Sequence, residues 1–248
     1  MSPQAAEDAL QELLRTNGNC TGKCLAGIRP DEMSMQQAVN QMARWGMLDI
    51  GDDDKGITFL HVLYLDPRQK QVNLNLTLTL RKKTETIDSV SFYIPRREDG
   101  EYLGADVWLA NREAWRAFRF DNLLKAYGTP SFVGFIMQTG DLKGRLIEYG
   151  IDVQYKQLNL DIGIGAMTYR DAKDDIFLCL SKDPHNLGVE INPVRPLTEV
   201  QQVYPITWQA LTGTDLDAFY QIFTDETNPD GCVKTTLKKI MELDPSFR

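Results

Sequence analysis

One segment, residues 72–80, constrains the fold of this chain more than any other. Its apolar and polar residues alternate strictly, so that Asn73, Asn75, Thr77 and Thr79 separate Val72, Leu74, Leu76, Leu78 and Leu80. A period of two residues is that of a β-strand, in which successive side chains point to opposite faces of the sheet. The pattern therefore predicts a strand with one face on a core and the other in water, which is typical of antiparallel sheets.

The neighbouring segments extend this strand into a sheet. Residues 57–65 and 87–94 also read as strands, and only short polar turns separate the three. Because parallel crossovers need a dozen or more residues, the three strands are predicted to form an antiparallel meander. Two helices are predicted before it. The first begins at Pro3 and ends before Asn17 and Gly18, and the second is capped by Ser34 with Gln37 as its capping box.

The same order, a helix and then strands, recurs in the second half of the chain. Residues 109–127 are predicted to be helical, with an interruption near Asp121, which is a good N-cap. Strands are then expected at residues 132–138, 146–155, 160–169 and 175–180. A Pro-rich stretch leads to a helix capped by Thr214 and to a last helix that starts near Cys232.

These elements predict an α+β fold. We expect two helix-plus-antiparallel-meander units with N- and C-terminal helices. The first domain, residues 1–100, holds the N-terminal helix and the first unit, and the second, residues 101–248, holds the second unit and the helical tail. With 248 residues, of which 42% are hydrophobic, the chain can bury a core of this size.

Charge and hydropathy exclude two classes of protein. The chain has 27 Lys and Arg against 35 Asp and Glu, a net charge of −8, which argues against a nucleic-acid binder. The longest apolar run, residues 57–65, is far short of the ~20 residues that a membrane-spanning helix needs. The first residues also lack the basic start and apolar stretch of a signal peptide.

No motif names a reaction. The chain has no Gly-x-Ser-x-Gly elbow, no phosphate-binding Gly-rich loop and no His-Glu-x-x-His helix, and its only histidines are His61 and His185. His61 lies in a predicted strand, and His185 is expected in a loop. The acidic clusters at residues 49–54 and 225–231 lack the calcium-loop pattern. We therefore expect no cofactor, no metal and no catalytic residues.

One segment has the character of an interaction surface. On a continuous helix, aromatic and guanidinium side chains would share one stripe at positions i, i+4, i+7 and i+11, namely Trp108, Arg112, Trp115 and Arg119. Trp and Arg are frequent in interaction hot spots, where they stack on one another. The alternative is that Trp115 and Phe118 belong to the core and the arginines line their rim.

Three stretches of the chain resemble a known family. The segment from Cys20 to Pro30, followed by residues 33–38, is similar to the opening of a family of uncharacterised bacterial secreted proteins and lipoproteins. In that family a Cys-rich loop leads to the pattern Gly-Ile-x-Pro-Gly-x-Thr and a helix, although this chain has Asp31 where the pattern has its second Gly. Residues 120–133, which contain a Tyr-Gly-x-Pro motif, and residues 216–232 resemble two further stretches.

The Tyr-Gly-x-Pro motif and the following meander also resemble, more distantly, the outer-membrane lipoprotein fold of the SmpA/OmlA type, shared by β-lactamase inhibitory protein. In those proteins the fold is a binding scaffold and not an enzyme. The resemblance implies an extracytoplasmic location, secreted or held by a lipid tether outside the given chain. The alternative location is the cytoplasm.

An extracytoplasmic location favours disulfides over free thiols. Four cysteines allow three pairings. We favour Cys20 with Cys24, whose short loop can turn back at Gly22, and therefore Cys179 with Cys232. The alternative joins Cys232 to one of the N-terminal cysteines and would clasp the two ends of the chain together.

Two functional hypotheses follow. The first is a non-enzymatic extracytoplasmic binding or protein-interaction module, whose partner is an unknown protein or small ligand. The alternative is a hydrolase of undetected type that uses scattered carboxylates and His61.

Overall fold

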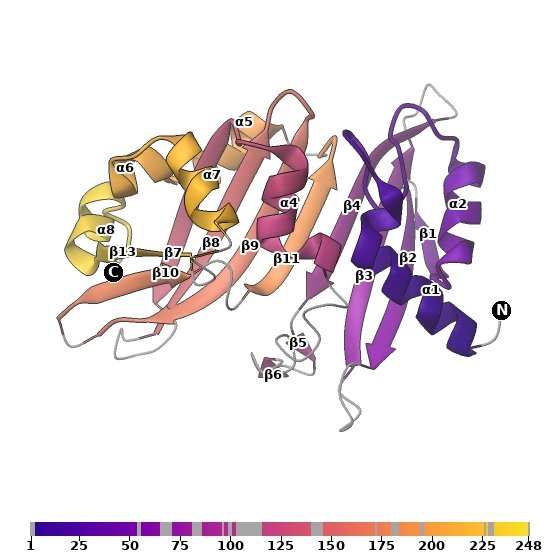
Figure 1. Ribbon diagram of the computed structural model, residues 1–248, viewed down its shortest axis with the longest axis horizontal. Coiled ribbons are helices and arrows are strands. Elements are labelled where there is room, and N and C mark those ends of the chain that lie inside the picture. The colour runs from indigo at the N-terminus through magenta and orange to yellow at the C-terminus, as the bar shows by residue number, and fades with distance from the viewer. Residues whose placement is uncertain are drawn as a thin grey trace. The chain divides into compact units, whose positions relative to one another are not determined.

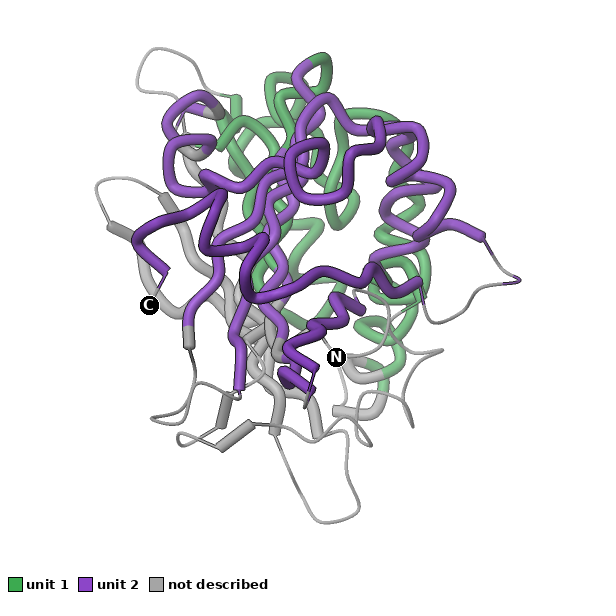
Figure 2. The backbone as a smooth tube through the Cα atoms, turned by 90° about the vertical axis from the view of Figure 1, so that its left-hand side faces the viewer, with its two compact units in different colours: residues 1–119, 157–160, 188–194 green, residues 120–156, 161–187, 195–248 purple. Residues whose placement is uncertain are grey.

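The chain folds into two compact units, shown in green and purple in Figure 2. Residues 1–119, 157–160 and 188–194 form unit 1, and residues 120–156, 161–187 and 195–248 form unit 2. The structure, a computed structural model, describes residues 3–53, 56–64, 71–80, 86–95, 97–98, 101–102, 116–139, 146–171, 173–179, 184–193, 196–225, 227 and 231–247.

Unit 1 contains the predicted meander. Strand β3 pairs antiparallel with β2 on one side and β4 on the other, and Leu76 lies opposite Phe59 and Phe92. The strands and their order are confirmed, whereas the expected two faces of β3 concern side chains outside the described part. A further strand, β1, was not predicted. In chain order the unit contains α1 (Pro3–Thr16), η1 (Asn17–Asn19), α2 (Met35–Arg44), β1 (Leu48–Asp53), β2 (Gly56–Tyr64), β3 (Gln71–Leu80), β4 (Ile87–Pro95), β5 (Arg97–Glu98), β6 (Glu101–Tyr102) and η2 (Arg116–Phe118).

The helices of unit 1 begin where local chemistry predicts. Helix α1 starts at Pro3, whose missing N–H costs nothing in a first turn. At the start of α2 the Gln37 N–H donates to Ser34 Oγ at 3.3 Å, and the Ser34 N–H donates to Gln37 Oε1 at 2.8 Å. This capping box confirms the prediction. Both helices bury one apolar face, formed by Leu10, Leu13, Leu14, Ala38 and Met42.

Unit 2 is built on strands β9, β8 and β7, in that order (Figure 1), with the short strand β12 on the other side of β7. Strand β7 pairs antiparallel with both β8 and β12. Strands β10 and β13 form a separate antiparallel pair, and β11 contributes residues to both units. In chain order the elements are α4 (Phe120–Tyr127), β7 (Phe132–Thr139), β8 (Leu146–Tyr155), β9 (Leu160–Tyr169), β10 (Asp175–Cys179), β11 (Pro184–Ile191), α5 (Leu197–Val203), β12 (Ile206–Thr207), α6 (Trp208–Thr212), α7 (Leu216–Thr224), β13 (Cys232–Thr236) and α8 (Leu237–Leu243).

Helices cover both faces of β8. The ring of Tyr155 lies 5.6 Å from that of Tyr127 on α4, while the neighbouring Gln154 accepts a hydrogen bond from Gln201 on α5. Successive residues of a strand point to opposite faces, so α4 and α5 lie on opposite sides of the strand. This explains why every residue from 151 to 155 is buried.

The tail of unit 2 differs from the sequence prediction. Residues 232–236 form a strand and not the start of the last helix, because they pair along their whole length with β10, and α8 begins only at Leu237. Helices α5 and α6 and strand β12 were not predicted. Asp215, and not Thr214, caps α7 by accepting the Ala218 N–H at 2.8 Å.

Two boundaries in the middle of the chain also differ. The break expected near Asp121 lies at Arg119, a bend between η2 and α4. His185, expected in a loop, lies in strand β11.

The predicted α+β class with terminal helices is confirmed. None of the helices in the described ranges is both long and apolar enough to cross a membrane.

Candidate interaction site at the edge of strand β7

Strand β7 keeps part of its outer edge open. Its inner edge pairs with β8 from Phe132 to Thr139. On the outer edge, β12 contributes only two residues, opposite Gly134 and Phe135. The pairing does not extend before Ile206, because the preceding residue, Pro205, has no N–H to donate. The residues before Pro205 belong to α5 and its end, and not to a strand. Within the described residues, the edge of β7 beyond Phe135 has no strand beside it.

A pocket of about 500 Å³ lies at this open edge. Three segments form its walls: residues 136–138 of β7, residues 202–205 at the end of α5, and the C-terminal residues 244–247. Its described lining consists of Ile136, Met137, Gln138, Gln202, Val203, Pro205, Asp244, Ser246 and Phe247. The pocket therefore combines an open strand edge with a mixed apolar and polar lining.

One glycine, Gly134, allows the α5 wall to approach the sheet closely. Tyr204, between α5 and Pro205, lies across β7 and β8. A Cβ at Gly134 would stand 2.8 Å from Tyr204 Cβ, and one at Gly150 would stand 3.4 Å from its Cε1. The first distance is shorter than non-bonded carbon atoms tolerate. The glycine at position 134 is thus what lets residues 204–205 lie against the sheet and form the pocket wall.

A buried polar cluster holds α5 in place. Gln201 Nε2 donates to Gln154 Oε1 at 2.8 Å, and Gln154 Nε2 donates to Asp152 Oδ2 at 2.7 Å. Asp152 and Gln154 are 1% and 0% exposed, so a substrate cannot reach them. Asp161 on β9 hydrogen-bonds to Asp152, and burial raises the pKa of Asp161 although that hydrogen bond lowers it. The carboxylate pair is therefore part of the support for the pocket wall.

The third wall is anchored by its last residues. Phe247 is 5% exposed and Asp244, which ends α8, is 8% exposed. Asp244 Oδ1 accepts hydrogen bonds from the Ser246 N–H at 3.0 Å and from Ser246 Oγ at 2.5 Å. These contacts fold the tail into a turn that faces β7.

The electrostatics of the pocket are set by one carboxylate. No described lining residue carries a positive charge. Both hydrogen bonds to Asp244 go to Oδ1, and Oδ2 has no partner among the described residues. Oδ2 also keeps some solvent-accessible surface, unlike the fully buried polar atoms without a hydrogen bond in the described part of the chain, such as Asp161 Oδ1. The pocket therefore presents a negative charge that no described lining residue neutralises.

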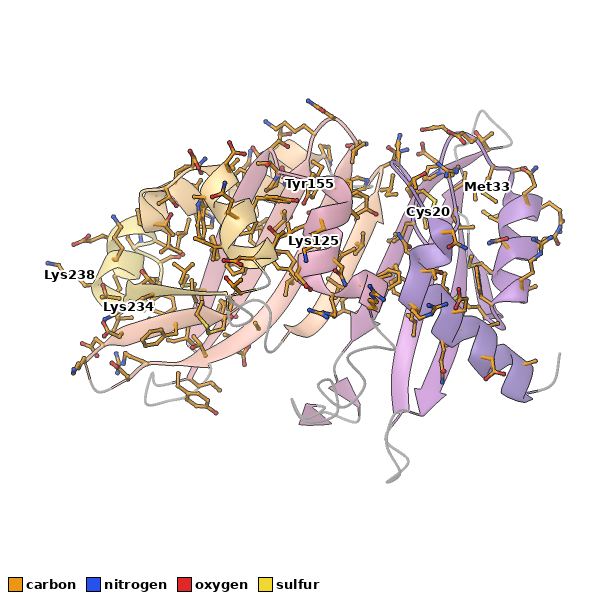
Figure 3. All side chains as sticks on the ribbon, in the orientation of Figure 1. Cys20, Met33, Lys125, Tyr155, Lys234 and Lys238 are labelled. Carbon is orange, nitrogen blue, oxygen red and sulfur yellow. A yellow bond between two sulfur atoms is a disulfide. The ribbon has the colours of Figure 1, made fainter. Side chains whose placement is uncertain are left out.

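A second surface lies at the other strand pair of unit 2. Phe177 on β10 is opposite Lys234 on β13 and is 42% exposed, and Tyr169 on β9 is 70% exposed. Lys234 Nζ lies 2.6 Å from Asp175 Oδ2, and Figure 3 shows Lys234 and Lys238 at the same end of the unit. This surface carries charges of both signs, so it favours no particular partner.

The structure describes only some of the site residues that the sequence predicted. Cys20 pairs with Cys24 and Cys179 pairs with Cys232, as predicted. Trp108, Arg112 and Trp115 lie outside the described residues, so their stripe stays a prediction, and the bend at Arg119 shows that this residue is not part of an α-helix. His61 lies in β2, and its side chain is outside the described part.

Sequence reasoning missed every residue of the pocket. Asp244, Pro245 and Ser246 are a typical turn sequence, and Pro205 is a typical strand end. Neither signal points to a pocket, because the pocket exists only where these segments meet β7. Among the described side chains, no group of three or more His, Cys, Asp or Glu is placed to hold a metal ion.

Comparisons with known proteins add no functional assignment. No family model, no curated protein and no solved structure matches this chain.

Proposed function

We propose that this protein is a non-enzymatic interaction module that binds an extended segment of a partner protein at the edge of β7. The observation that carries the proposal is the pocket of about 500 Å³ formed against an unpaired part of that edge. A strand edge presents alternate N–H and C=O groups, and an extended peptide can pair with them as an added strand.

The shape of the pocket supports a peptide segment over a small substrate. One wall is a strand whose outer-edge backbone groups beyond Phe135 have no neighbouring strand within the described residues. An added strand would satisfy those groups and place every second side chain toward the lining residues. Pro205 supports the same conclusion, since it stops the chain's own β12 from occupying this position.

The site also lacks what a hydrolase would need. Its one described carboxylate, Asp244, is not accompanied by a second acid or a histidine among the lining residues. The carboxylates that do form a pair, Asp152 and Asp161, lie beneath α5, and Asp152 is 1% exposed. These observations favour binding over catalysis.

The proposal includes an extracytoplasmic location, in a secreted or lipid-tethered form. Its support is the pair of disulfides, which persist in oxidising compartments, together with the resemblance of the Cys-rich opening to secreted proteins. Mass spectrometry of protein alkylated in its native compartment tests the location. We expect all four cysteines to escape alkylation, and four alkylated thiols would refute an oxidising compartment.

Selection of random peptides on the immobilised protein tests the binding function. We expect peptides to be enriched on the protein and to lose affinity for a Val203→Trp variant, because the larger side chain fills the pocket. Val203 is 42% exposed, so the substitution does not disturb the core.

Met241→Trp is the matched control. Met241 is 47% exposed and lines a different pocket, next to Lys238. Peptides should bind this variant like the unmodified protein. Enrichment no better than on an unrelated disulfide protein would refute the function, and loss of binding in Met241→Trp alone would refute the position of the site.

A further inference from the structure

We propose that the β7-edge pocket selects a basic side chain, with Asp244 receiving the lysine or arginine of the bound segment. This inference rests on the proposed function and specifies the chemistry of the partner. It follows from the burial of Asp244, the geometry of its carboxylate and the apolar character of the walls around it.

The burial of Asp244 calls for a positive partner. Asp244 is 8% exposed as a residue, so its side chain has lost part of its hydration, and no described lining residue compensates its charge. Hydrogen bonds from Ser246 satisfy Oδ1 only. A donor that arrives with positive charge would satisfy Oδ2 and neutralise the site, which a neutral donor cannot do.

The walls suit the rest of a basic side chain. Ile136, Val203 and Phe247 line the pocket together with Pro205, so the described lining has apolar surface beside the carboxylate. Lysine and arginine have long aliphatic stems that pack on apolar surface while the charged end reaches a polar group. An acidic or short polar side chain would gain neither contact.

The strand edge restricts where the basic residue can lie. In a segment paired with β7, side chains alternate between the two faces of the sheet, and residues on one face repeat every second position. Only one position of the segment can therefore place its side chain against Asp244. We expect a single required lysine or arginine among the enriched peptides and not a general preference for basic sequences.

Binding measurements with one enriched peptide test this inference. The peptide chosen has arginine as its basic residue. This arginine is replaced by citrulline, which keeps the shape of arginine without the charge, and affinity for the unmodified protein is measured by calorimetry. We expect the citrulline peptide to bind about 10- to 100-fold more weakly, the usual effect of losing one charge-assisted hydrogen bond.

The Asp244→Asn variant completes the comparison. Asparagine can still accept both hydrogen bonds from Ser246, so the tail should keep its turn. This variant should bind the arginine and citrulline peptides with equal affinity, because the charge that separates them is gone. Glu242→Gln is the control: it removes one exposed negative charge, two residues away and outside the pocket lining, and should leave the arginine preference intact.

The outcomes separate the inference from the function on which it rests. Equal binding of the two peptides to the unmodified protein would overturn the role of Asp244 while leaving peptide binding in place. An equal loss of preference in Glu242→Gln and Asp244→Asn would show a diffuse charge effect and would also overturn it. If Asp244→Asn fails to fold, the citrulline peptide on the unmodified protein still decides the question.

Discussion

Asp31 adopts a backbone conformation that favours glycine. Its φ angle is 68°, in the left-handed region where a Cβ atom is crowded. In this chain the carboxylate compensates: Oδ2 accepts hydrogen bonds from Lys23 Nζ at 2.9 Å and from Asn192 Nδ2 at 3.2 Å. The side chain and the backbone therefore act in opposite directions on stability.

Two substitutions at this position separate the effects. Asp31→Gly and Asp31→Ala both remove the carboxylate contacts, but only alanine keeps the Cβ atom. We expect Asp31→Ala to be less stable than Asp31→Gly by about 1 kcal/mol, measured by urea unfolding. Equal stabilities would show that the left-handed conformation carries no cost here.

Asp161 and Asp171 should give opposite pH dependence of stability. Burial raises the pKa of Asp161 above its ordinary 3.8, so the folded state binds this proton more tightly than the unfolded chain. The free energy of unfolding should therefore decrease as the pH rises from 3.8 through the raised pKa. Asp161→Asn, whose amide can donate to Asp152 as a protonated carboxyl would, should lack this decrease.

Asp171 is the contrasting case. It accepts the backbone N–H groups of Asp175 and Lys173 in the turn before β10, and these hydrogen bonds lower its pKa. Its stabilising contribution should be present above pH 3.8 and be lost as the pH falls through the lowered pKa. Urea unfolding of the unmodified protein, of Asp161→Asn and of Asp171→Asn across pH 3 to 8 checks the direction of both pH effects on the free energy of unfolding. Parallel pH profiles for all three proteins would contradict the assignment.

At the scale of secondary-structure elements, the helices of unit 2 are joined by an aromatic cluster. Phe219 on α7 is fully buried, with its ring centre 5.0 Å from that of Trp208 on α6 and 6.1 Å from that of Phe120 on α4. Both contacts are edge-to-face, an arrangement that aromatic pairs prefer. The Trp208 Nε1–H also donates to the Asp215 carbonyl at 2.8 Å, which ties the start of α7 to α6.

Removing the central ring should therefore loosen three helices together. We expect Phe219→Ala to lower the free energy of unfolding by about 3–5 kcal/mol, as for other large cavities in cores. Gln221→Ala on the exposed side of the same helix should change it by less than about 0.5 kcal/mol. Circular dichroism in urea measures both, and equal effects would contradict the assigned core face of α7.

At the scale of the whole molecule, each unit has its own disulfide. Cys20–Cys24 closes a short loop in unit 1, with a separation of 4 residues. Cys179–Cys232 joins β10 to β13 in unit 2 across 53 residues. Since a cross-link restricts the unfolded chain more when its loop is longer, the second bridge should contribute about 4 kcal/mol and the first about 2 kcal/mol.

Replacing each pair by serine tests this division. Cys179→Ser with Cys232→Ser should reduce amide-exchange protection in unit 2, around β10, β13 and α8. Cys20→Ser with Cys24→Ser should reduce protection only near α1 and α2. Hydrogen exchange followed by mass spectrometry locates both effects, and loss of protection in unit 1 when the second bridge is removed would contradict independent stabilisation of the two units.

Local patterns predicted much of this fold because their causes act over a few residues. The alternation in residues 72–80 predicted β3, the runs at 146–155 and 160–169 match the bounds of β8 and β9, and the Ser34 capping box forms as expected. Each signal depends on side chains that are neighbours along the chain. The Cys20–Cys24 pairing was accessible for the same reason.

The tertiary structure decided the rest. Residues 232–236 became a strand because β10 lies beside them, and β12 begins only after Pro205, opposite Phe135 of β7. The pocket joins segments more than a hundred residues apart, so no local pattern encodes it. The sequence by itself determined the local elements and which cysteines could pair. Only packing determined which strand edge stays open and which carboxylate, Asp244, lies beside it, because both depend on contacts between distant segments.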